Sequence, residues 1–129
     1  MTIQDIYRGE DVSLQLTVNY DDGTAVDLTQ VNGYKVEIFQ DGKIIQKFSK
    51  NAATGYTLTT AVTLASGIFK VNILGTNTVD AYCDKPVYYN IKIEFDDTSF
   101  PSLVAAKDSG NVQFATMRES KQRSQTTFV

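Results

Sequence analysis

The chain has 129 residues, 42% of them hydrophobic and 21% charged, and its 15 acidic and 12 basic residues leave a net charge of −3. This length fits one domain with one modest core, and the negative balance gives no overall electrostatic attraction to nucleic acid. The sequence contains no histidine, which removes the side chain that most often binds metal or acts as a general base near neutral pH, so we expect no enzymatic activity.

The first residues, Met1-Thr2-Ile3-Gln4-Asp5, lack the basic start and apolar stretch of a signal peptide. No run of about 18 apolar residues occurs, so we expect synthesis in a cytoplasm and no membrane partner. A virus particle can nevertheless carry such a protein outside the cell. Cys83 is the single cysteine, which excludes an intrachain disulfide and a cysteine-based zinc site within one chain.

The N-terminal half is predicted to form strands. Apolar and polar residues alternate over residues 12–20, the period that places apolar side chains on one face of a strand. Asp21-Asp22-Gly23 then predicts a turn, because glycine accepts a positive φ angle and aspartate bonds to nearby amides. Two further apolar runs, 34–38 and 44–48, flank Asp41-Gly42, a pattern typical of a β-hairpin.

The middle of the chain continues the same pattern. Residues 54–64 are rich in threonine and suit short strands. Residues 68–74, bounded by Gly67 and Gly75, predict a central strand. Residues 76–84 are too short for a stable helix, and we expect them to form a loop that crosses between two sheets.

A second long alternation covers residues 87–95, with Pro86 at its first position, where a missing amide is least harmful. Residues 96–111 are predicted to form a loop and residues 112–116 one more short strand.

No segment shows the 3.6-residue repeat of an amphipathic helix, which leaves about seven short strands. The predicted fold is therefore all-β, an immunoglobulin-like antiparallel β-sandwich over residues 1–117. Residues 118–129 have no apolar period and are predicted to form an extended C-terminal tail.

Four segments between residues 7 and 95 carry a family resemblance. They are Tyr7-Arg8-Gly9-Glu10-Asp11, Leu14-Gln15-Leu16-Thr17-Val18, Asp22-Gly23-Thr24-Ala25-Val26-Asp27-Leu28-Thr29 and Leu64-Ala65-Ser66-Gly67-Ile68-Phe69-Lys70-Val71. In this order they resemble the immunoglobulin-like N-terminal domain of the phage baseplate upper protein family. The resemblance implies a structural protein of a tailed-phage virion, present in several copies, whose partners are other virion proteins and itself. Unlike family members, the sequence carries no large C-terminal region for a fibre or receptor-binding extension, which leaves tail, baseplate, neck and head decoration open.

The tail supplies the candidate assembly contacts. Arg118, Lys121 and Arg123 give it positive charge, and Phe128 and Val129 place apolar side chains at its end. A hydrophilic tail that only contacts solvent does not need such anchors, so we expect an arm that orders on a neighbouring subunit. The alternative is a free polar tail.

Three tyrosines support a rival prediction, a carbohydrate-binding or adhesin module. Tyr82, Tyr88 and Tyr89 could form an aromatic platform for sugars. Strand alternation places Tyr88 outward and Tyr89 inward, so we expect them mainly to serve the core and its edge.

Two acidic pairs, Asp21-Asp22 and Asp96-Asp97, lie at predicted strand ends. Calcium binds clustered carboxylates, but neither pair has the spacing of a full ligand loop. We therefore expect turn chemistry, with no metal and no cofactor.

Overall fold

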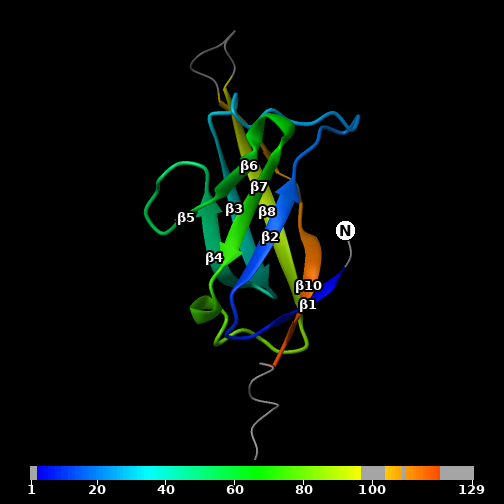
Figure 1. Cartoon of the computed structure of the whole chain (residues 1–129), viewed down its shortest axis with the longest axis vertical. Coiled ribbons are helices and arrows are strands. Elements are labelled where there is room, and N and C mark those ends of the chain that lie inside the picture. The colour runs from blue at the N-terminus through cyan, green and yellow to red at the C-terminus, as the bar shows by residue number, and fades with distance from the viewer. Residues whose placement is uncertain (1–2, 97–103, 109, 120–129) are drawn as a thin grey trace, which may run out of the picture.

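The computed structural model describes residues 3–96, 104–108 and 110–119 (Figure 1). These residues form two β-sheets that face each other as a β-sandwich, which confirms the predicted all-β class. The larger sheet has the order β1 (Gln4–Tyr7), β10 (Val112–Arg118), β8 (Pro86–Asp96), β3 (Gly33–Gln40), β4 (Lys43–Ser49) and β5 (Thr57–Leu58), with β9 (Val104–Asp108) also paired to β8. The smaller sheet has the order β2 (Val12–Thr17), β7 (Ile68–Ile73) and β6 (Thr60–Thr63).

One hydrophobic core fills the space between the two sheets. Phe48 and Phe114 of the larger sheet and Phe69 of the smaller sheet are completely buried. The rings of Tyr34 and Phe69 meet across this space with their centroids 4.6 Å apart. Alternate burial along β2, β3 and β7 follows the predicted period, so the strand pattern in the sequence determines which side chains form the core.

The predicted hairpin is confirmed. β3 and β4 pair antiparallel through Asp41 and Gly42, whose φ angles are +39° and +82°. Positive φ at both central residues is the two-residue turn whose twist matches the flanking strands. Pro86 is the first residue of β8, as expected.

The first predicted strand is shorter than expected. β2 ends at Thr17, and Asn19 forms an isolated bridge with Ala25. Its partner β7 begins only at Ile68, opposite Thr17. The residues after Thr17 therefore have no partner in β7, and Asn19 pairs with Ala25 across the following turn instead. The side chain of Tyr20 is consequently 46% exposed instead of joining the buried face.

Residues 96–111 were predicted to form a loop, and this prediction is wrong for β9. β9 and β10 lie one after the other along the same edge of β8, both antiparallel to it. At the break between them, the Asn90 side chain donates hydrogen bonds to the Gly110 carbonyl (3.2 Å) and to Asn111 Oδ1 (3.3 Å).

Strand β1 was not predicted either. Its four residues pair in parallel with β10, from Gln4 opposite Ala115 to Tyr7 opposite Arg118. The edge of β10 therefore imposes extended structure on a segment with no alternation of its own.

The segment from β5 to β6 moves from one sheet to the other. β5 pairs in parallel with β4, and β6 then pairs antiparallel with β7. Between them, Thr59 Oγ1 lies 2.6 Å from the buried Tyr34 hydroxyl, which holds this crossing against the core. Two short 3₁₀ turns, η1 (Leu64–Ser66) and η2 (Gly75–Asn77), complete the described part of the chain, in which no helix has the length and apolar character needed to cross a membrane.

Candidate functional site

The segment Arg8–Asp11 connects β1 to β2 and docks on the turn η2. Gly9 N donates to Thr78 Oγ1 (2.8 Å), and Gly75 N donates to Asp11 Oδ1 (2.7 Å). The backbones approach so closely that a Cβ atom on Gly75 would lie 2.3 Å from the Gly9 carbonyl oxygen. Residues 8–11, part of the first segment of the family resemblance, therefore form a close backbone contact with η2, which we call a joint.

The segment Val26–Thr29 forms a second joint with the chain just before β7. Val26 and Leu28 are buried, and Leu28 N donates to the Leu64 carbonyl (2.8 Å). Gly67 has a φ angle of +74°, and a Cβ atom there would lie 2.4 Å from the Val18 carbonyl oxygen. These segments build the sandwich and leave its faces and edges as the surfaces available for contact.

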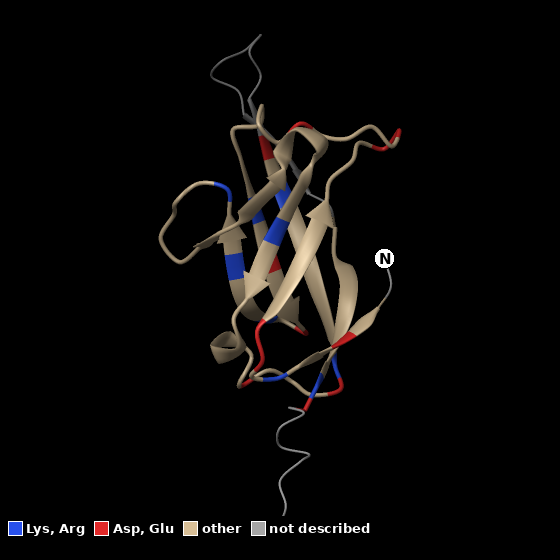
Figure 2. Cartoon of the chain, viewed as in Figure 1, with Lys and Arg blue, Asp and Glu red and all other residues tan. Residues whose placement is uncertain are grey.

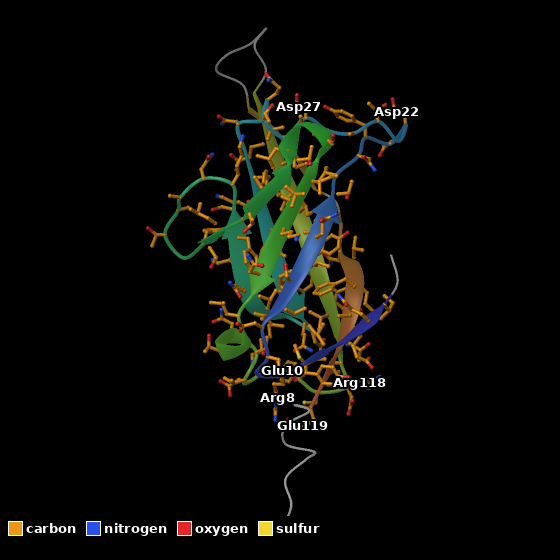
Figure 3. The ribbon with its side chains drawn as sticks, viewed as in Figure 1. Arg8, Glu10, Asp22, Asp27, Arg118 and Glu119 are labelled. Atoms are coloured by element: carbon orange, nitrogen blue, oxygen red, sulfur yellow. The ribbon has the colours of Figure 1, made fainter. Side chains whose placement is uncertain are left out.

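Arg118, predicted as the start of the tail, belongs to the sandwich as the last residue of β10 (Figure 3). Its guanidinium group pairs with Asp84 (2.8 Å) and Asp5 (3.2 Å), and its carbonyl accepts a hydrogen bond from Arg8 N (2.9 Å). Two hydrogen bonds from the guanidinium group raise the pKa of Arg118, and the bond to Asp84 contributes more than the bond to Asp5. Strand β10 thus ends at Arg118, one residue beyond the predicted end of the sandwich at residue 117.

The same end of the molecule carries a further ion pair, between Arg8 and Glu119. Arg8 Nη2 lies 2.9 Å from both carboxylate oxygens of Glu119. Cys83 is half-buried outside the core, and its thiol lies 3.9 Å from Glu119 Oε2. The remaining predicted arm residues, Lys121, Arg123, Phe128 and Val129, lie outside the described residues, so the arm stays a prediction.

The outer face of the larger sheet carries a row of apolar side chains, which we call the apolar row. It consists of Ile44 on β4, Phe39 on β3 and Tyr88 on β8, which are successive cross-strand partners. The Phe39 and Tyr88 rings stack with their centroids 5.7 Å apart and their planes at 22°. Next to this row, Lys47, Glu37 and Asn90 form a polar row in the same register.

Ile44 reaches this face because of an irregularity in β4. Between the pairs Ile38–Gln46 and Phe39–Ile44, Ile45 has no cross-strand partner. Ile45 turns inward and is buried, whereas Ile44 turns outward and is 52% exposed.

An open hollow of about 290 Å³ adjoins the apolar row through Ile44. It is lined by Ile44, Ile45, Gln46, Lys47, Gly55, Thr57 and Asn77.

Two lysines contact one aromatic ring, that of Tyr56. The Nζ atoms of Lys47 and Lys35 lie 4.7 and 5.1 Å from the centre of the Tyr56 ring. The cation–π contact of Lys47 holds one positive charge in the polar row, next to the apolar row.

The three predicted tyrosines do not form one platform. Tyr89 packs against the core beside Phe114, and burial raises its pKa. Tyr82 is exposed in the loop before β8, with Lys43 Nζ 5.1 Å from its ring centre. Tyr88 alone of the three belongs to the apolar row.

The acidic pair at residues 21–22 takes part in a turn. Asp22 Oδ1 accepts a hydrogen bond from Thr24 N (2.8 Å), and hydrogen bonds from Thr24 lower the pKa of Asp22. Asp96 ends β8, and Asp97 lies outside the described residues. Within the described ranges, no three Cys, Asp or Glu side chains gather as a possible metal site.

Comparisons of the chain with protein-family models, curated protein sequences and solved structures find no match.

Proposed function

We propose that the chain is an immunoglobulin-like sandwich that serves as a non-enzymatic structural or adaptor protein of a tailed-phage particle. The protein is synthesised in the cytoplasm of the host bacterium. In the particle it belongs to the tail, the baseplate, the neck or a head decoration. The strand order supports the immunoglobulin-like assignment: β3, β8 and β10 lie side by side in one sheet, facing a second sheet of β2, β7 and β6. Two packed sheets of mainly antiparallel strands are the framework of such domains.

The apolar row is the observation that carries a contact function. Ile44, Phe39 and Tyr88 lie next to one another on the outer face of the sheet, and none of them belongs to the core. Ile44 is exposed and the two rings are half-buried. Aromatic side chains are enriched at protein–protein interfaces, and contiguous exposed apolar side chains mark such sites. The partners are other virion proteins and further copies of the chain.

The first experiment is mass spectrometry of purified phage particles from the source. We expect the chain as a stoichiometric component, and its clear absence contradicts the proposal. Phe39→Ala and Tyr88→Ala should then reduce incorporation into particles. Lys92→Ala is the matched control, because Lys92 is exposed on the same sheet face but lies outside the row.

The stacked rings of Phe39 and Tyr88 also favour a second function, a carbohydrate-binding or adhesin module. Stacked aromatic rings on an outer sheet face suit a sugar, because a ring offers a broad apolar surface with little loss of entropy. A glycan array with the purified protein separates the two functions. Repeated binding to specific glycans that Tyr88→Ala abolishes favours the module, whereas an empty array leaves the virion role.

A further inference from the structure

Strand β2 has an open edge. On one side it pairs with β7, and among the residues that the structure describes no strand lies beside its other side. Val18 N donates to the Gly67 carbonyl, so the even-numbered residues of this segment point their peptide groups toward β7. By the alternation of an antiparallel ladder, the N–H and C=O groups of Ser13, Gln15 and Thr17 point outward.

The other described edges have features that discourage pairing. β5 has two residues, β1 has four and carries Asp5, and β6 has four and an irregular register. The sequence of β9 ends in Lys107-Asp108. Short length, charge and bulges are the common means by which proteins protect sheet edges.

β2 has none of these protections. Its six residues pair with β7 in unbroken register and include no proline. They also include no charged residue, so the strand is tan along its length in Figure 2. An uncharged, regular edge of this length is a template for another strand.

We propose that β2 pairs antiparallel with β2 of a second copy of this chain, about a twofold axis at Gln15. Gln15 then faces Gln15 of the second copy, and Ser13 faces Thr17. Each of these pairs exchanges two backbone hydrogen bonds, and the two smaller sheets become one six-stranded sheet. This inference goes beyond the virion proposal and does not depend on it.

The side chains of β2 are self-complementary in this register. On the exposed face, hydroxyl groups of Ser13 and Thr17 oppose each other, and the two Gln15 amides supply matching donors and acceptors. On the inner face, Leu14 opposes Leu16 and Val12 opposes Val18. The two valines are only partly buried in one copy, so pairing covers them further.

Charge does not oppose this pairing. The nearest cation on this face is Lys70, the partner of Gln15 in β7. Three strand spacings separate it from Lys70 of the second copy, about 14 Å, which exceeds the Debye length of about 8 Å at physiological salt.

The test measures the mass of the full chain by size-exclusion chromatography with light scattering over a range of concentrations. The variants are Gln15→Lys and Gln15→Glu, each of which places like charges opposite one another at the axis. Asn72→Lys is the matched control, because Asn72 is exposed on the same face but lies on the central strand β7.

We expect dimers for the wild-type chain and for Asn72→Lys, and a dimer Kd at least tenfold weaker for each Gln15 variant alone. Mixing the two Gln15 variants should restore the dimer, since lysine then faces glutamate, and this rescue shows that both variants are folded. A monomer at every concentration overturns the proposal, as does a dimer unaffected by charge at position 15. Loss of the dimer on deleting residues 120–129 also overturns it, because the added strand would then come from the tail.

Discussion

At the scale of single residues, Gly75 shows how a close approach of two backbones controls the fold. A Cβ atom at this position would meet the Gly9 carbonyl oxygen at 2.3 Å and Glu10 N at 2.9 Å. Gly75→Ala must therefore push the β1–β2 connection away and weaken the bond from Gly75 N to Asp11. We expect the free energy of unfolding to fall by about 3 kcal/mol in urea denaturation.

Gly33→Ala provides the control for this prediction. An added Cβ atom at Gly33 meets only the ends of two side chains, Asn51 at 3.4 Å and Glu94 at 3.9 Å. Both changes restrict the unfolded chain to the same degree. Equal losses in the free energy of unfolding for the two substitutions would therefore show that the contact between Gly75 and Gly9 does not control stability.

The buried amide of Gln46 connects the two sheets at one residue. Its Oε1 accepts a hydrogen bond from Leu74 N (3.0 Å), and its Nε2 donates to Thr57 Oγ1 (3.2 Å). Gln46→Leu keeps the side-chain volume but leaves the Leu74 amide without this acceptor. We expect urea denaturation to show a loss of about 1–3 kcal/mol, while Gln113→Leu on the half-exposed outer face changes stability by less than about 0.5 kcal/mol.

The sequence contained a signal for one such buried amide. Gln40 follows Tyr34, Val36 and Ile38 at the same two-residue spacing, so strand period alone places it inside. Its partners, the peptide groups of Tyr82, could not be predicted, because they lie in a loop whose position depends on tertiary packing.

At the scale of secondary-structure elements, the missed strand β1 contributes to the core through one side chain. Ile6 is 4% exposed and faces the core, whereas Ile3, just before the strand, is 47% exposed. Ile6→Ala should reduce the free energy of unfolding by about 2–5 kcal/mol, and Ile3→Ala by less than about 1 kcal/mol. If both have small effects in thermal unfolding, β1 does not pair with β10 as described.

Strands with strong alternation could be predicted from the sequence, and strands that depend on a neighbour could not. β2, β7, β8 and the β3–β4 hairpin all show the period or a turn signal in their own residues. β1 and β9 show neither, because they form only on the edges that β10 and β8 offer. Cross-strand pairing of this kind depends on packing more than on intrinsic preference.

The apolar row shows why the candidate site was even less predictable. Alternation from Phe48 through Gln46 places Ile44 on the inner face. The bulge at Ile45 reverses this and brings Ile44 beside Phe39. A bulge re-aims side chains, and no residue in the sequence of β4 marks its position.

At the scale of the whole molecule, the two ends of the described chain are held together. Arg8 pairs with Glu119, and Arg118 pairs with Asp5 and Asp84 (Figure 3). All the buried apolar residues of the described core precede Arg118. The sandwich therefore includes residues up to Glu119. The predicted assembly arm begins after this residue.

This boundary makes the arm prediction testable without damage to the fold. A variant that ends at Glu119 keeps all three ion pairs and the hydrogen bond from Arg8 N to the Arg118 carbonyl. We expect its thermal unfolding and its dimer to match those of the full chain, while its incorporation into phage particles is lost, because Lys121, Arg123, Phe128 and Val129 are gone.

A variant that ends at Met117 is the control for the sandwich itself. It lacks Arg118 and Glu119 and should lose only a little stability, because exposed ion pairs contribute little individually. If the variant ending at Glu119 enters particles as well as the full chain does, the tail is not an assembly arm. The apolar row of the larger sheet then remains the proposed contact surface of the sandwich.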